Sequence, residues 1–143
     1  MMSAAEQILR NHGLRITQFR MDTVQLFLLA GKALSSADVE ASLRDSDRIT
    51  LYRTLKTLED KGVIHKAIDG TQVIKYALCE SSCDEHHHHD KHIHFHCTRC
   101  ENTVCLDHVF VPDVTLPAGF VATEAHMIVN GVCESCNRRM LLP

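Results

Sequence analysis

Residues 50–78 read TLYRTLKTLEDKGVIHKAIDGTQVIKYAL, and this stretch decides how the first half of the chain folds. Leucine recurs at positions 51, 55 and 58, a spacing that forms one apolar face of a helix. Two strand-like runs follow, over residues 63–67 and 73–78, on either side of Asp69-Gly70, a dipeptide typical of hairpin turns. The stretch therefore predicts a helix followed by a β-hairpin.

Further helices are expected ahead of this stretch, because capping and stop residues divide residues 1–62 into short helical segments. The expected helices cover residues 4–11, a segment after Thr17 up to residue 30, a segment through residue 43, and the leucine-bearing segment up to residues 61–62. The cap and stop residues are Gly13, Thr17, Gly31, Ser35 or Ser36, and Asp47 or Thr50. Helices followed by a hairpin favour a winged helix-turn-helix, although any small helical domain with a hairpin fits the same pattern.

Four side chains of the leucine-bearing helix lie off its apolar face, and at least some of them are expected to face outward: Tyr52, Arg53, Lys56 and Lys61. On an exposed face, Tyr52 and Arg53 would suit a recognition helix, in which Arg reads guanine edges in the major groove. An ordinary solvated helix face explains the same residues equally well. The pattern alone leaves both interpretations open.

The second half of the chain has a different composition. The chain has 143 residues, enough for one compact domain or two small ones, and all seven Cys and nine of its eleven His follow residue 78. The net charge of −3 shows no basic excess, but residues 1–78 carry +2 and residues 79–143 carry −5. The polar segment 79–90 is expected to be a linker or long loop.

The strongest motif is a pair of cysteine pairs, Cys97-x-x-Cys100 and Cys133-x-x-Cys136. Two such turns present four thiolates tetrahedrally to Zn²⁺, which favours a structural zinc site over four unrelated buried thiols. Because residues 101–132 are a long separation, intervening strands must bring the pairs together. Such a closed site stabilises its domain, and removal of the metal should unfold it.

Histidines precede the first cysteine pair at a period of two. If His92, His94 and His96 lie on a strand, their imidazoles share one face, and imidazole is a common ligand of Zn, Fe and Ni. The tract at residues 86–89 resembles a weakly chelating loop, and Cys83 in the same segment has no assigned role.

An enzyme is not expected. Residues 86–91 nearly form the H-x-H-x-D-H pattern of metallo-hydrolases, but Lys91 occupies the place of the last His. Motifs of zinc proteases, nucleophile elbows and phosphate-binding loops are missing, so no small-molecule substrate is expected. No apolar run is long enough for a signal peptide or membrane span, and we expect a cytoplasmic protein with no membrane partner.

Four pieces of sequence occur in order along most of the chain. They are Gly13-Leu14-Arg15-x-Thr17-x-x-Arg20, then Leu51-Tyr52-Arg53-Thr54-Leu55-x-x-Leu58-x-x-x-Gly62-Val63-Ile64, the His-rich segment before Cys97-x-x-Cys100, and Gly131-Val132-Cys133-x-x-Cys136. Together they resemble the ferric uptake regulator (Fur) family of bacterial metal-dependent repressors.

The resemblance implies an α+β fold of two domains and a homodimer that binds palindromic double-stranded DNA when it holds metal. A winged-helix DNA-binding domain is expected over residues 1–78, a hinge and His-rich loop over 79–91, and a small α/β dimerisation domain over 92–143. Arg15, Tyr52 and Arg53 match DNA contacts of the family. The paired Cys match its structural zinc site. Pro112 and Pro117 leave little room for the usual helix of the dimerisation domain.

The resemblance also implies a regulatory metal site at the hinge. Iron-sensing members have a His and a Glu where this chain has Ala33 and Ala77, and the peroxide-sensing branch uses Asp at some ligand positions. The zinc-sensing branch (Zur) fits better, because thiolates and imidazoles suit Zn²⁺ more than Fe²⁺. Its pattern gives five candidates for about four ligand positions: His65, Cys79, His92, His94 and Cys105. Fe²⁺ or Mn²⁺ is the alternative metal. The alternative functions are an iron- or peroxide-sensing member of the same family, or a DNA-binding redox switch at Cys79, Cys83 or Cys105 with structural zinc alone.

Overall fold

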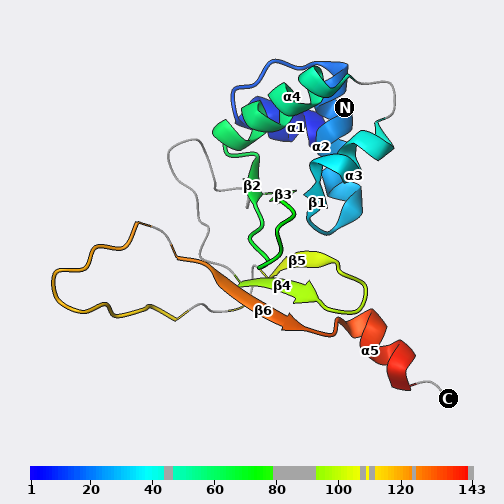
Figure 1. The fold of residues 1–143 in the computed structure, drawn as a ribbon. Coiled ribbons are helices and arrows are strands. Elements are labelled where there is room, and N and C mark those ends of the chain that lie inside the picture. The colour runs from blue at the N-terminus through cyan, green and yellow to red at the C-terminus, as the bar shows by residue number, and fades with distance from the viewer. Residues whose placement is uncertain (44–46, 79–92, 107–108, 110–111, 124, 142–143) are drawn as a thin grey trace.

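The computed structural model of the chain describes residues 1–43, 47–78, 93–106, 109, 112–123 and 125–141. Helices gather in the N-terminal part and a sheet forms the C-terminal part, so the predicted α+β class is confirmed (Figure 1). The elements are α1 (Ala4–Asn11), α2 (Gln18–Ala30), β1 (Leu34–Ser35), α3 (Ser36–Ser42), α4 (Arg48–Asp60), β2 (Ile64–Lys66), β3 (Lys75–Leu78), β4 (Ile93–Cys97), β5 (Thr103–Leu106), β6 (Met127–Gly131) and α5 (Glu134–Leu141).

Side-chain caps set the beginnings of the helices. Thr17 accepts from the Arg20 amide ahead of α2, and Gly31 ends that helix in the left-handed region. Of the alternatives at α3 and α4, Ser35 and Asp47 are the caps. Each satisfies backbone N–H groups that have no partner within the helix.

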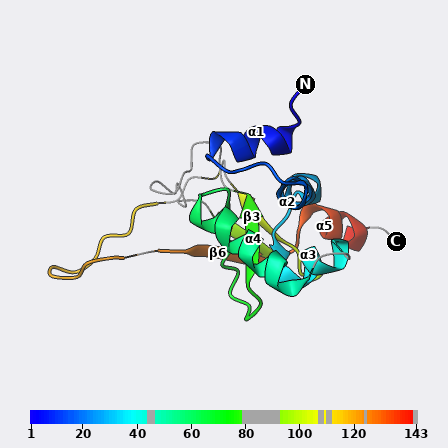
Figure 2. The ribbon, with the colours of Figure 1, turned by 90° about the horizontal axis from the view of Figure 1, so that it is seen from above.

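The first four helices share one apolar core. The leucine stripe of α4 faces this core as predicted, since Leu51, Leu55 and Leu58 are all buried. Val24 and Phe27 of α2 lie in the same cluster. Ile64 of β2 belongs to this cluster as well, and Tyr76 and Leu78 of β3 pack against it. In Figure 2 the view from above shows α4 in front of the hairpin strands.

The hairpin after α4 forms a three-stranded antiparallel sheet in the order β1-β3-β2. Its strands are shorter than the predicted runs 63–67 and 73–78, because residues between Lys66 and Lys75 form a wider loop rather than a tight two-residue turn. Asp69 explains the difference, since its buried side chain faces the second sheet instead of solvent. Strand β1, over Leu34–Ser35, was not predicted, and it pairs with β3.

A second three-stranded sheet has the order β5-β4-β6. Strand β5 pairs antiparallel with β4, whereas β6 pairs parallel to it, from Ile93 opposite Met127 to Cys97 opposite Gly131. These are the intervening strands that the long cysteine separation required. The β2–β3 hairpin lies between the helices and this sheet in Figure 1.

Between β5 and β6 the described residues contain no helix, in agreement with the two prolines there. Residues 112–123 extend away from the rest of the molecule in both ribbon views (Figures 1 and 2). Their apolar side chains are exposed, among them Phe120 and Val121. Within the described residues, no helix has the length and hydropathy that a membrane crossing requires.

Candidate metal centres and DNA interface

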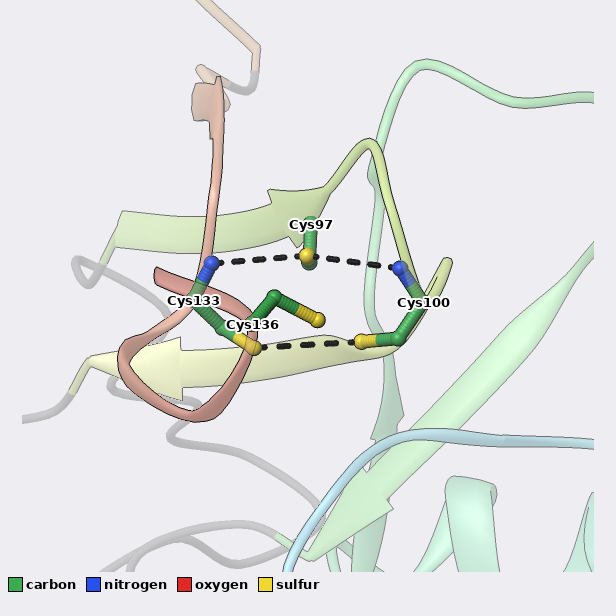
Figure 3. Close-up of side chains that lie close together, drawn as sticks. All are labelled: Cys97, Cys100, Cys133 and Cys136. Atoms are coloured by element: carbon green, nitrogen blue, oxygen red, sulfur yellow. Dashed lines mark hydrogen bonds between the residues drawn. The ribbon is translucent and has the colours of Figure 1, made fainter. Parts of the chain in front are cut away.

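The four paired cysteines converge at one end of the second sheet. Cys97 ends β4, Cys100 follows in the next turn, Cys133 follows β6, and Cys136 lies in α5. Parallel pairing of Cys97 with Gly131 brings the two cysteine pairs together. All four sulfurs lie within 4.8 Å of one another (Figure 3).

These distances fit zinc. The sulfurs of Cys100 and Cys133 are 3.9 Å apart. A tetrahedral zinc with Zn–S bonds of about 2.3 Å separates its sulfurs by about 3.8 Å. The four-cysteine cluster predicted from the spacing is therefore present, and its donor set and its size suit Zn²⁺.

Electrostatics at the cluster also favour a cation. The backbone N–H groups of Cys100 and Cys133 donate to the Cys97 sulfur at 3.5 and 3.3 Å and lower the pKa of that thiol to about 6. The hydrogen bond with Cys133, burial and the other thiols raise the pKa of Cys136 to about 12. Four thiolates repel one another at this spacing, and a divalent cation removes that repulsion.

A second group of metal-binding side chains joins the two parts of the molecule. His65 lies on β2 of the first sheet, whereas His94 and Cys105 face each other on β4 and β5 of the second. The Cys105 sulfur lies 3.4 Å from Nε2 of His65, and the two imidazole rings stack at 5.7 Å between centroids. The ligand atoms of all three residues lie within 4.8 Å of one another, and both histidines are buried.

One hydrogen bond fixes how His94 faces this group. Its Nδ1 donates to the carbonyl of Ile68 at 3.1 Å. A histidine held through Nδ1 in this way presents Nε2 to a metal. These three soft or borderline ligands come from two different sheets. A metal can therefore bind all three only while the two sheets remain packed against each other.

Two other candidate ligands, Cys79 and His92, lie outside the described residues, as do Cys83 and the histidines at 86–89. The structure thus brings together three of the five candidates for the regulatory site. His96, the last histidine of the periodic run, belongs to neither cysteine-containing group. Its Nδ1 lies 3.0 Å from the Thr103 hydroxyl instead.

Ala33 and Ala77, which the family resemblance matches to ligand positions of iron-sensing members, are both buried. Ala33 and Ala77 pack with Ala67 in a small buried cluster, and Cys105 lies against it. Methyl groups cannot bind a metal. The described metal-binding side chains nearby are instead His65 on β2 and Cys105 on β5.

The expected DNA contacts lie on the surface. Tyr52 is 55% exposed on α4, and its neighbour Arg53 is exposed too, while the leucines of the same helix face the core. Arg15, ahead of α2, is also exposed, and its backbone carbonyl accepts from the Arg20 guanidinium at 2.9 Å. In Figure 1, α4 lies on the side of the molecule away from the second sheet, where a duplex could approach.

Sequence reasoning missed one buried polar cluster between the two sheets. Asp69, expected only as a turn residue, contacts Lys75 and Thr103. The turn dipeptide marked its place, but no local pattern indicates that the carboxylate points inward.

Comparison with known proteins gives a consistent result. The model of the ferric uptake regulator family matches residues 11–114. A ferric uptake regulation protein of Staphylococcus aureus is 30% identical over 138 residues, which cover 92% of this chain and 95% of that protein. Its counterpart in Staphylococcus epidermidis is 29% identical over 141 residues, with 94% and 95% covered.

Solved structures share the fold. A zinc uptake regulator complexed with zinc and DNA has a TM-score of 0.64 at 20% identity, covering 96% of this chain and 93% of that one. The ferric uptake regulator of Helicobacter pylori, described as revealing three functional metal binding sites, has a TM-score of 0.57 at 17% identity, with 94% and 95% covered. At these identities the likeness concerns the fold alone.

Proposed function

The chain belongs to the ferric uptake regulator family of metal-responsive, DNA-binding transcription regulators, and on this premise we propose that it is a zinc-sensing repressor. It binds palindromic DNA as a homodimer when zinc occupies the hinge site. The family is not enzymatic, which agrees with the expectation from the sequence. We assign residues 1–78 to the DNA-binding domain, 79–91 to the hinge and 92–143 to the dimerisation domain.

The observation that carries this proposal is the group His65, His94 and Cys105. Its members come from the hairpin of the DNA-binding part and from the second sheet. Cys79 and His92, close by in sequence, are the further candidates, and either one would complete four ligands. A site that spans two domains links metal binding to the angle between them, which is what a sensor requires.

The donor chemistry supports zinc over iron. Imidazole and thiolate ligands suit tetrahedral Zn²⁺, whereas Fe²⁺ and Mn²⁺ sites in proteins use more oxygen donors. The methyl groups of Ala33 and Ala77 remove two ligands that the iron pattern needs. Zinc is thus the favoured metal for the hinge site as well as for the four cysteines.

In the proposed mechanism, the wing is the β2–β3 hairpin, residues 64–78, and His65 anchors it to the ligands of the second sheet. The two recognition helices of a dimer then lie at a fixed separation, which must match half-sites about 34–36 Å or a multiple apart. Tyr52 and Arg53 of each copy would enter the major groove, and Arg15 would contact DNA ahead of the second helix. Metal and DNA favour the same arrangement, so each strengthens the binding of the other.

Serine substitution of the ligand thiols tests the proposal. Cys79→Ser and Cys105→Ser should abolish the gain in DNA affinity on zinc addition, a gain of about 5–150-fold for typical coupling. The measurement is fluorescence anisotropy with a palindromic duplex selected by the zinc-loaded protein from a random library. Cys83→Ser, in the same segment as Cys79, is the matched control and should retain the gain.

Three results would contradict this function. An unchanged zinc response in both Cys79→Ser and Cys105→Ser would show that the hinge site does not mediate the response. Activation by Fe²⁺ under anaerobic conditions, with none by zinc, indicates an iron or peroxide sensor. DNA binding that follows thiol oxidation, with a single zinc bound per chain, indicates a redox switch.

The dimer is tested separately. Light scattering on the zinc-loaded protein should give twice the chain mass of 16.1 kDa. The outer strand β6 and the exposed apolar residues 114–121 are the surface expected to be covered, and a monomer at micromolar concentration would contradict the assignment.

A further inference from the structure

Asp69 lies in the loop between β2 and β3 and is 2% exposed. Its Oδ1 accepts hydrogen bonds from the amide of Thr71 at 2.9 Å and from the Thr71 hydroxyl at 2.6 Å. Its Oδ2 accepts from the Thr103 hydroxyl at 2.7 Å and pairs with the Lys75 ammonium at 2.9 Å. Both oxygens of a buried carboxylate are thus satisfied, one within the wing and one across the boundary to the second sheet.

In the contact across the boundary, the donor and the acceptor of each hydrogen bond can be assigned. Thr103 is the first residue of β5 and is completely buried. Because its hydroxyl donates its single hydrogen to Asp69, it accepts from His96 Nδ1 at 3.0 Å and from Lys75 at 3.2 Å. Lys75 also donates to the carbonyl of Glu101 at 3.1 Å. One hydroxyl orientation therefore satisfies the whole cluster.

The carboxylate is charged at neutral pH. Burial alone raises the pKa of Asp69, but the hydrogen bonds from Thr71, Thr103 and Lys75 outweigh burial and hold the pKa well below its usual range. A buried charge with complete partners contributes little net stability but strongly favours one geometry. When one partner is removed, the charge regains water only if the boundary opens.

Other hydrogen bonds cross the same boundary. The amide of Ala33 donates to the carbonyl of Thr103 at 2.7 Å, and Lys32 donates to the Asn102 side chain at 3.0 Å. His94 donates to the carbonyl of Ile68, the residue directly before Asp69. The wing loop thus also positions the partner that orients His94. All these contacts use protein groups alone.

We propose that Asp69 is a latch that does not depend on the hinge metal: it holds the β2–β3 hairpin on the second sheet through Thr103, so that His65 already faces His94 and Cys105 before metal binds at the hinge. The hinge site is then largely formed while only the four-cysteine site holds zinc. Asp69 and Thr103 act as positioning residues, since they bind no metal themselves. A site formed in advance binds metal more tightly, because the competent arrangement is already populated.

Three substitutions isolate the latch. Thr103→Val removes the hydroxyl with little change in volume, and Thr103→Ser restores it. Thr71→Val is the matched control, because it removes a hydroxyl from the same carboxylate but leaves the contact across the boundary intact. Asp69→Asn is a fourth variant, which keeps the shape of the side chain and removes its charge.

The main readout is hydrogen exchange at the Ala33 amide, measured by NMR with one equivalent of zinc per chain. We expect exchange to be about tenfold faster or more in Thr103→Val and Asp69→Asn, the loss typical of one buried hydrogen bond. Thr103→Ser and Thr71→Val should exchange at the native rate. Exchange at Leu55 and Leu58 in α4 should not change in any variant, which shows that the DNA-binding core remains folded.

Native exchange at Ala33 in both Thr103→Val and Asp69→Asn would overturn the latch, and so would a native protein whose Ala33 amide is already unprotected without hinge metal. A second arm rests on the proposed function: the affinity for the second zinc equivalent should fall about tenfold or more in Thr103→Val. If the native protein binds no second zinc, the proposed function fails. The exchange result still decides the latch in that case.

Discussion

Cys97 and Cys136 belong to one cluster but lie in opposite electrostatic environments. Two backbone N–H groups point at the Cys97 sulfur, whereas Cys136 lies among neighbouring thiols. At neutral pH the first is therefore mostly thiolate and the second is protonated. Zinc must displace protons from the cluster when it binds.

The affinity of the four-cysteine site for zinc should consequently rise with pH. Because Cys136 has a raised pKa, it keeps its proton throughout the neutral range, and each rise in pH makes the loss of that proton easier. Competition with a chromophoric chelator between pH 6 and 8 measures the affinity. Calorimetry in buffers of different ionisation enthalpy should show that zinc binding releases protons, and a pH-independent affinity would contradict this.

The cap of α3 illustrates how an element begins. Ser35 accepts from the amide of Asp38 at 3.1 Å, and the Asp38 carboxylate accepts from the Ser35 amide at 3.0 Å. This reciprocal pair also ends β1, so Ser35 belongs to the sheet and to the helix at once. Such caps stabilise a short helix that would otherwise be marginal in water.

Ser35→Ala should therefore lower the free energy of unfolding by about 1 kcal/mol. Urea unfolding of the zinc-loaded chain, followed by circular dichroism, measures the change. Ser36→Ala, one residue further and outside the capping pair, is the control and should change stability much less. Equal effects of the two substitutions would show that the capping box contributes nothing specific.

Elements with local patterns were predictable, and those defined by distant contacts were not. The Leu51 stripe, the Thr17 cap and the Gly31 stop predicted α4 and the bounds of α2, because periodicity and caps act within one turn of helix. Strand β1 depends on pairing with β3, and the wider wing loop depends on Asp69 reaching Thr103. Helix α5 was not predicted either, although Glu134 in its first turn and Arg138 in its last suit the helix dipole.

The same distinction holds for the candidate sites. The cysteine motif predicted its cluster because each pair closes a tight turn. His65 and Cys105 were found only through the family resemblance, since they are far apart in sequence and adjacent only where two sheets meet. The Asp69 latch had no signal beyond a turn dipeptide.

At the level of the whole molecule, the two parts differ in how they are stabilised. The first four helices share an extensive apolar core. In the described part of the second sheet and α5, the buried residues are few and partly polar, such as Ile93, His94 and Thr103. A zinc ion bound by the four cysteines would supply much of the stability that a larger core would give.

Removal of zinc by a strong chelator should thus unfold the second sheet and leave the helices folded. The amides of Phe95 and Val129 should lose protection from hydrogen exchange, while those of Leu55 and Val24 keep theirs. Cys100→Ser should have the same effect without chelator. Simultaneous loss of both sets of amides would show that the parts unfold as one cooperative unit.

The parallel pairing of β4 with β6 also sets the order of assembly. Residues 93 and 127 must meet across a long excursion of chain, and loop closure of this kind is slow compared with helix formation. The helical part and its α4 surface should therefore form before the second sheet, which carries His94 and Cys105 of the proposed hinge site. A newly made or zinc-starved chain would then pass through an interval in which the helical part is folded but the proposed hinge site is not yet assembled. The length of that interval would depend on the zinc supply.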